Sequence, residues 1–327
     1  MRLPLIGPPP CRALSGTCSN GARRHSAIRR SAATHREGTA VSEQTDFDST
    51  SRTITAGRFE LHYNEAGTDK PGTPVLFLHG SGPGVNGWSN FSGNFAAFAE
   101  QRRTIILDMP GFGRSPALEW DAAYPRVAAE AVAALLDELG IEKADIVGNS
   151  MGGNVACEAA LATPGKVRRM ALMGPGGLAE NLFAPNPSEG SRRLFDFLKN
   201  PSEEAMEAWV DTMVGNRDVV SPELIADRTR RALEPGVIAQ TMGIFGSIFN
   251  PEFKTLPLWA RAEGIVQPTL LIWGRDDRML PYEGAHFAYR HLPDAELHVF
   301  SNCGHWAMIE QRESFNRLVL EYFTRED

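Results

Sequence analysis

Apolar and polar positions along the chain follow the strand period and the helix period in turn. Residues 52–67 alternate apolar and polar side chains and predict two strands joined by a turn. The continuous apolar run at 73–80, TPVLFLHG, is typical of a buried strand, whereas residues 124–141 repeat at helical spacing. Further strands are expected within 103–115, 144–148, 167–177, 268–274 and 295–300, and further helices at 91–101, 150–164, 282–292 and 312–323. Strands that alternate with helices predict an α/β fold with a mostly parallel central sheet flanked by helices.

This alternation stops before the last two strands. Residues 178–262 contain no expected strand, and helical segments occupy 189–200, 202–214, 221–234 and 236–249. Ser202 and Ser221 are residues typical of helix starts. A helical block inserted here predicts a lid over the carboxyl edge of the sheet, where ligands bind in open α/β sheets. An ordinary helical subdomain is the alternative. The expected organisation is an extension at 1–45, a core at 46–177 and 263–327, and an inserted lid at 178–262.

The first forty residues differ from the rest in charge and composition. They hold seven arginines, no lysine and one acid, Glu37, which gives +6 and leaves −13 for the remainder of a chain of net charge −7. They are rich in Ser, Gly and Pro and lack apolar periodicity. We expect residues 1–45 to be a disordered or mis-started extension. A transit peptide is less favoured because GPPP at 7–10 would break an amphipathic helix.

The composition of the remainder limits the classes of partner. An acidic body argues against nucleic acid, and it means that an anionic substrate would need a dedicated cation in its site. No apolar run is long enough to span a membrane. Cys157 and Cys303 lie far apart, and no metal-ligand spacing or disulfide framework is visible, so a reducing cytoplasm fits. We expect a small-molecule enzyme without a metal or other cofactor.

One short motif carries the chemistry. Gly148-Asn149-Ser150-Met151-Gly152 has the form G-x-S-x-G and stands between an expected strand and an expected helix. A serine at such a sharp turn has a strained backbone that requires small neighbours, and its hydroxyl is exposed at the top of the sheet. Ser150 is therefore the expected nucleophile.

A serine hydroxyl needs a base to take its proton, and the base needs an acid to orient it. In this architecture the acid and then the histidine follow the serine in the chain. Asp277 is the preferred acid because of its place in WGRDDRMLP, and Asp276 is the alternative. His305 is the expected base, because SNCGHWAM follows the last strand beside a glycine. Ordinary helix or strand positions are expected for His286, His291 and His298.

Two backbone N–H groups are expected to stabilise the oxyanion. One belongs to Met151, the residue after the nucleophile, and the other to Ser81 in the glycine-rich HGSGPG loop. His79 and Asp108 are expected to shape loops rather than to catalyse.

Several longer stretches extend the pattern from about residue 59 to the end. They are LHYNEAG, LHGSGPGVNGWSNF, VGNSMGG, LMGPGGL, LFAPNPSEG, WGRDDR, LHVFSNCGHWA and ESFN. With these stretches the chain resembles the α/β-hydrolases, and among them the meta-cleavage-product hydrolases. Those enzymes cleave a C–C bond of ring-opened 2-hydroxy-6-oxo-hexa-2,4-dienoates during degradation of aromatic compounds or steroids. Ser81 is a departure, since many members have glycine there, although serine keeps the N–H group.

The resemblance implies a set of substrate-binding residues, namely Asn90, Asn149, Arg228 and Trp306. Arg230 and Arg231 lie close to Arg228 in sequence and are alternatives, and each of these side chains could instead be structural. The resemblance also implies a homo-oligomer and an anionic dienoate as substrate. Phe183, Met213 and Phe249 are expected to form an apolar pocket for the acyl part of that substrate. A carboxylesterase or lactonase with the same triad, or a non-catalytic receptor, remains the alternative.

Overall fold

The structure is a computed structural model that describes residues 45–179 and 187–325. The expected extension at 1–45 therefore lies almost wholly outside the described residues. In the described ranges no helix is both long and apolar enough to cross a membrane. Two short predictions, the caps at Ser202 and Ser221, are confirmed, because each hydroxyl accepts a hydrogen bond from the backbone N–H three residues later.

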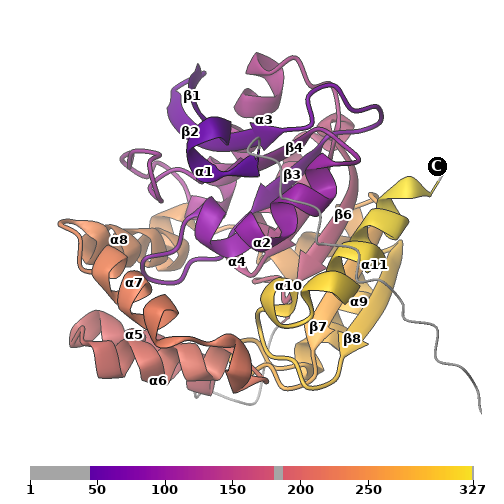
Figure 1. Cartoon of the computed structure of the whole chain (residues 1–327). Helices are drawn as coiled ribbons and strands as arrows, with labels where there is room; N and C mark the ends of the chain where they lie inside the picture. The colour runs from indigo at the N-terminus through magenta and orange to yellow at the C-terminus, as the bar shows by residue number, and fades with distance from the viewer. Residues whose placement is uncertain (1–44, 180–186, 326–327) are drawn as a thin grey trace, which may run out of the picture. The chain divides into compact units, whose positions relative to one another are not determined.

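The described strands form one sheet of eight in the order β1-β2-β4-β3-β5-β6-β7-β8. The pairs β1·β2 and β2·β4 are antiparallel, and the remaining pairs are parallel. The strands are β1 Ser51–Ala56, β2 Phe59–Ala66, β3 Val75–Leu78, β4 Thr104–Leu107, β5 Ala144–Asn149, β6 Val167–Met173, β7 Thr269–Gly274 and β8 Ala295–Phe300. The predicted α/β class with a mostly parallel sheet is confirmed (Figure 1).

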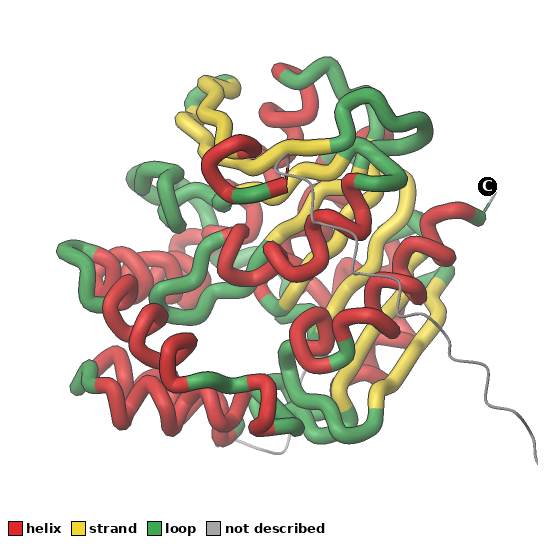
Figure 2. The backbone as a smooth tube through the Cα atoms, viewed as in Figure 1, coloured by secondary structure: helices red, strands yellow, loops and turns green. Residues whose placement is uncertain are grey.

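Helices surround this sheet and also form a separate group (Figure 2). The core helices are α1 Phe47–Thr50, α2 Gly87–Ala99, α3 Tyr124–Glu138, α4 Met151–Ala162, α9 Glu283–His291, α10 Ala307–Glu310 and α11 Arg312–Thr324. The group inserted between β6 and β7 consists of α5 Glu189–Lys199, α6 Glu203–Met213, α7 Pro222–Ala232 and α8 Val237–Phe249. We call α5–α8 the helical insertion. Figure 1 shows it gathered to one side of the strands.

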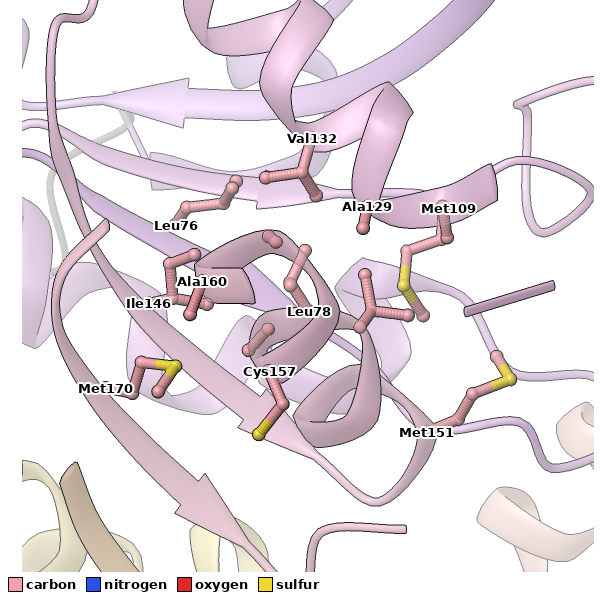
Figure 3. Close-up of a cluster of buried hydrophobic side chains, with 14 of the residues drawn as sticks. Leu76, Leu78, Met109, Ala129, Val132, Ile146, Met151, Cys157, Ala160 and Met170 are labelled. Carbon is pink, nitrogen blue, oxygen red and sulfur yellow. The ribbon is translucent and has the colours of Figure 1, made fainter. Parts of the chain in front are cut away.

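The two faces of the sheet pack separately because side chains alternate along each strand. In β3, Leu76 and Leu78 belong to one buried cluster, and Val75 and Phe77 belong to the other. The first cluster joins the sheet to α3 and α4, as Figure 3 shows for side chains of the strands and these helices. The second joins it to α2 and α11, and it continues into α5, α6 and α7 of the helical insertion. Helices α5–α7 of the insertion are thus anchored by the apolar surface that covers one face of the sheet, whereas Ile244 of α8 belongs to the first cluster and α8 packs on α3.

The segment around the expected boundary at 262 packs on the core. A 3-10 helix, Leu258–Gly264, packs against α4 and α9 of the core rather than against the insertion. Leu258 and Ala262 are buried there in the first cluster. The last helix of the insertion itself ends at Phe249.

Candidate active site

Ser150 lies at a sharp turn between β5 and α4. Its backbone angles are φ 55° and ψ −112°, a region that residues with side chains rarely adopt. Hydrogen bonds hold the turn: Ser150 N–H donates to the Met173 carbonyl at 2.9 Å. The Ser150 carbonyl accepts from the N–H groups of Gly153 and Gly176 at 3.0 and 2.9 Å. Backbone strain that is braced from both sides is the geometry that G-x-S-x-G predicts for a nucleophile.

Gly152 allows α4 to begin directly behind this turn. A Cβ atom at Gly152 would lie 2.1 Å from the carbonyl oxygen of Leu78 and 2.7 Å from that of His79. Both carbonyls belong to backbone at the end of β3, which cannot move aside cheaply. The small residue predicted two positions after the serine is therefore required by packing.

His305 and Asp277 form a buried hydrogen-bonded pair. His305 Nδ1 lies 2.7 Å from Asp277 Oδ2, and both side chains are 1% exposed. The other carboxylate oxygen of Asp277 accepts the N–H groups of Met279 and Leu280, each at 2.8 Å. These bonds fix the carboxylate, and the carboxylate in turn fixes the imidazole so that Nε2 is left for chemistry.

The alternative acid and histidines lie elsewhere. Asp276 pairs with the neighbouring Arg275 and is 40% exposed at its side chain. His286 and His291 are on α9, where they contact Tyr282 and Phe287, and His298 packs on Phe300 in β8. The structure therefore brings Asp277 and His305 together, and it leaves the alternatives in ordinary surroundings.

Ser150 and His305 line the same small cavity. Within the described residues, His305 Nε2 is buried and has no hydrogen-bond partner, so the Ser150 hydroxyl is not bonded to it in this state. Catalytic hydrogen bonds are often long in a free enzyme and shorten when substrate binds. The pair and the serine are thus adjacent across a cavity into which a substrate carbonyl would fit.

The two backbone N–H groups expected to stabilise the oxyanion have no hydrogen bond to a backbone carbonyl among the described residues. Met151 opens α4, where an α-helix provides no internal acceptor for the N–H group. Ser81 lies in the loop after β3, and its N–H donates to no backbone carbonyl in the described part of the chain. That loop runs beside the strand-to-helix turn at Ser150, which we call the elbow, because a Cβ on Gly80 would lie 3.5 Å from Ser150 Cβ.

His79 and Asp108 brace the neighbouring loops. His79 is fully buried, accepts from Met109 N–H through Nε2, and bonds the Gly80 carbonyl through Nδ1. Burial lowers the pKa of His79. Burial alone would raise the pKa of Asp108, but hydrogen bonds from His62 and from the Arg114 N–H hold it below its ordinary value. Neither side chain lines the cavity at Ser150.

Arg228 is a buried cation that has no counter-ion among the described residues. Its side chain extends from α7 and lies between two indoles, with Cζ 5.0 Å from the ring centre of Trp209 and 4.8 Å from that of Trp306. Its Nε donates to the Pro83 carbonyl at 3.2 Å. In the described ranges no carboxylate lies within 4.0 Å of it, and burial lowers its pKa to about 9. A buried cation of this kind favours an anionic ligand.

The neighbouring arginines of α7 have other partners. Arg230 pairs with Asp227 and Glu234 at the surface, and Arg231 pairs with Asp227. Only Arg228 of the three lines the cavity that holds Ser150. Position in the fold therefore favours Arg228 over Arg230 and Arg231 as the residue that faces a ligand in this cavity.

The two asparagines differ in their hydrogen bonding. Asn90 Oδ1 accepts from Gly80 N–H at 3.3 Å, while its buried Nδ2 has no partner among the described residues. Asn149 Nδ2 makes two long bonds of 3.4 Å to the carbonyls of Met173 and His305. Asn90 therefore has a free donor at the cavity, and Asn149 combines cavity lining with bracing of the elbow.

The cavity at Ser150 is almost closed. Its free volume is about 10 Å³, roughly the space of one water molecule. Leu194 of α5, Met213 of α6 and Met279 after β7 supply its apolar lining. Met213 thus lies where an acyl pocket was expected, whereas Phe249 is 73% exposed and lines a separate surface pocket. Phe183 lies outside the described residues.

Some residues that line the cavity were not predicted from the sequence. Trp209 is the largest of them, and nothing in EEAMEAWVDTM distinguishes it from a core residue. Met279 could have been found from its place two residues after Asp277. Gly82 and Val85 follow from the glycine-rich loop once its position beside the elbow is known.

The chain matches known proteins over most of its length. The family model for the alpha/beta hydrolase fold matches residues 73–311. A 2-hydroxy-6-oxo-6-phenylhexa-2,4-dienoate hydrolase from Burkholderia cepacia is 38% identical over 268 residues, which are 81% of this chain and 91% of the relative. A solved meta-cleavage product hydrolase from Pseudomonas fluorescens IP01 is 31% identical with a TM-score of 0.72, over 83% of this chain and 97% of that one. This chain belongs to the meta-cleavage-product hydrolases of the α/β-hydrolase family.

A second branch of relatives has dicarboxylate substrates in its name. The 2-hydroxy-6-oxononadienedioate/2-hydroxy-6-oxononatrienedioate hydrolase of Comamonas testosteroni is 37% identical over 81% of this chain and 91% of its own length. The family expected from the sequence motifs is therefore confirmed.

In this hydrolase a partly buried carboxylate, that of Glu310, links the helical insertion to the loop of His305. Glu310 Oε2 accepts the N–H groups of Gly215 and Asn216, which follow α6, at 2.7 and 2.8 Å. Its Oε1 accepts the Gly304 N–H at 2.8 Å. Burial raises the pKa of Glu310, and these N–H donors oppose that rise. The Glu310 carboxylate thus joins the residues that follow α6 to the loop that carries His305.

Proposed function

We propose that this protein hydrolyses the C–C bond beside the ketone of a 2-hydroxy-6-oxo-hexa-2,4-dienoate, in degradation of aromatic compounds or steroids. The observation that carries this substrate class is Arg228, a buried cation that lines the same cavity as Ser150 and His305 and has no counter-ion in the described part of the chain. An ester hydrolase needs the triad and the oxyanion donors but has no use for such a cation. A dienoate places a carboxylate where the cation can bind it.

The chemistry requires an electron sink before the bond can break. The 2-hydroxy dienol first becomes the keto form, with a proton moved from the hydroxyl to the carbon chain, so that the later carbanion is conjugated with the new ketone. Arg228 binds the carboxylate, and Asn90 Nδ2 and the Trp306 indole are placed to hold oxygens as charge moves. Asn149 supports this subsite from the elbow.

Ser150 then attacks the remaining ketone while His305 takes the hydroxyl proton. The oxyanion formed is stabilised by the N–H groups of Met151 and Ser81. Its collapse breaks the C–C bond, the electron pair moves through the conjugated chain onto the C2 oxygen, and that oxygen takes up the proton held by His305, which gives 2-hydroxypenta-2,4-dienoate. Water, deprotonated by His305, hydrolyses the acyl group left on Ser150 and releases a carboxylic acid. Asp277 keeps the imidazole oriented throughout.

Access to the site requires movement of the helical insertion, which we propose acts as a lid. The free volume is far below that of a dienoate, and Leu194, Trp209, Met213 and Arg228 all come from α5–α7. We also propose a homo-oligomer in the cytoplasm, on the family resemblance and the unpaired cysteines. Light scattering after size exclusion measures the oligomeric state.

Replacement of the nucleophile tests the proposal. The kcat of Ser150→Ala for a phenyl-substituted dienoate should be at least 10³-fold below that of the wild type. This substrate is yellow, so its cleavage is measured as loss of colour. The variant should still bind the substrate. A wild-type enzyme that hydrolyses p-nitrophenyl esters and leaves the dienoate intact would instead identify an esterase or lactonase. Failure of a serine-directed phosphonate to label Ser150 would identify a non-catalytic receptor.

A further inference from the structure

The indole N–H of Trp209 is a buried donor that has no acceptor among residues 45–179 and 187–325. Trp209 lies on α6, is 1% exposed, and lines the cavity together with Ser150, Asn90 and Arg228. In the described part of the chain its Nε1 atom has no hydrogen-bond partner. A buried donor left without an acceptor costs about 1–3 kcal/mol, so its retention calls for an explanation.

Packing holds the Trp209 indole against the HGSGPG loop, which contains Ser81, and against the guanidinium of Arg228. A Cβ at Gly82 would lie 2.3 Å from Cη2 of Trp209 and 2.9 Å from a terminal nitrogen of Arg228. The indole and the guanidinium therefore rest together on the Gly82 backbone. The Trp209 and Trp306 rings stand nearly perpendicular, at 81°, with Arg228 against both.

A requirement for an aromatic face alone does not account for the N–H group. Phenylalanine also presents a π-face to a guanidinium and carries no polar atom, although tryptophan gives the stronger contact. The unpartnered N–H group instead matches the unpaired Arg228 and the free Nδ2 of Asn90 in the same cavity. Trp209 Nε1 and Asn90 Nδ2 are hydrogen-bond donors, and Arg228 is a cation. A single carboxylate, whose oxygens have several lone pairs, satisfies all three groups.

We propose that Trp209 Nε1 donates a hydrogen bond to the carboxylate of the dienoate substrate, which makes Trp209 a substrate-binding residue that selects for the anionic end. This inference rests on the proposed function. The carboxylate rather than the acyl end is assigned because Trp209 lies against Arg228, while Leu194, Met213 and Met279 form the apolar part of the cavity.

Two variants separate the N–H group from the ring. Trp209→Phe removes the donor and reduces the ring, whereas 3-benzothienylalanine at position 209 keeps a fused ring and replaces N–H by sulfur. A hydrogen bond to a charged group corresponds to about a 10- to 100-fold effect. Both variants should lose that factor in the ratio of kcat/KM for the phenyl dienoate to kcat/KM for p-nitrophenyl butyrate, which has no carboxylate. Trp259→Phe, a tryptophan packed on α9 outside the cavity, is the matched control.

Each result decides the matter. Dienoate kcat/KM within twofold of wild type for the benzothienyl variant would refute the hydrogen bond, and the packing of the ring would then be its role. An equal loss on both substrates would show a structural role and also overturn the inference. If the wild-type protein cleaves only the ester, the proposed function fails, and Trp209 then has no carboxylate to bind.

Discussion

Arg228→Met should make the protein more stable while it removes the activity. A pKa lowered from 12.5 to about 9 corresponds to roughly 5 kcal/mol of unfavourable free energy for the charged side chain in the folded protein. The contacts with two indoles return about 1–2 kcal/mol, and the hydrogen bond to Pro83 about 1 kcal/mol. About 2–3 kcal/mol of cost therefore remains, and methionine, apolar and of similar length, avoids it.

The sign of the pH dependence follows from the direction of the shift. Both the folded and the unfolded state hold the proton below pH 9, so the full cost is present there. It is relieved as pH rises through the folded pKa towards the unfolded one. The stabilisation by Arg228→Met is thus expected at pH 7, as an increase in Tm of about 3–6 °C. The dienoate kcat/KM should fall about 100- to 1000-fold, because the substrate carboxylate then has no cation.

Two further variants serve as controls for Arg228→Met. Arg228→Lys retains the charge but loses the planar fork, so it should weaken dienoate turnover without raising Tm. Arg230→Met removes a 65% exposed arginine from the same helix and should change stability by less than about 0.5 kcal/mol. A decrease in Tm for Arg228→Met, measured without ligand by thermal unfolding, would refute the reasoning, because it would mean that the cation is already compensated in the folded protein.

Three further changes test the geometry of the site. Asp277→Asn should lower kcat by about 10³- to 10⁴-fold and Asp276→Asn by less than twofold; equal losses in steady-state assays would contradict the assignment. Gly152→Ala should destabilise the fold by more than about 3 kcal/mol, because its Cβ would meet backbone, and Gly165→Ala, with open space around it, should not. Denaturant unfolding of the two alanine variants compares them, and similar midpoints would exclude the clash. Glu310→Ala should leave three N–H groups without an acceptor and lower stability by about 2–4 kcal/mol, whereas a Tm unchanged within 1 °C would show that the carboxylate is dispensable.

The sequence by itself determined the order of strands and helices and the chemical core of the site. Periodicity is a local property, so the strands, the elbow at Ser150 and the helical insertion could be identified without knowledge of long-range contacts. The acid and the base could be placed because each follows a strand, and the carboxyl ends of parallel strands share an edge. The spacing within WGRDDRMLP already favoured Asp277 over Asp276 as the acid.

Only the tertiary structure decided which side chains share the cavity and which polar atoms are left without partners. Arg228 shares a buried face of α7 with Ile225 and Ala232, which helical spacing can indicate, but its isolation from any carboxylate depends on packing between distant segments. Trp209 reads as an ordinary core residue in its own helix, and Phe249, at the end of α8, is exposed because no element covers it there. Burial and hydrogen-bond satisfaction depend on neighbours from far along the chain, and a local pattern does not contain them.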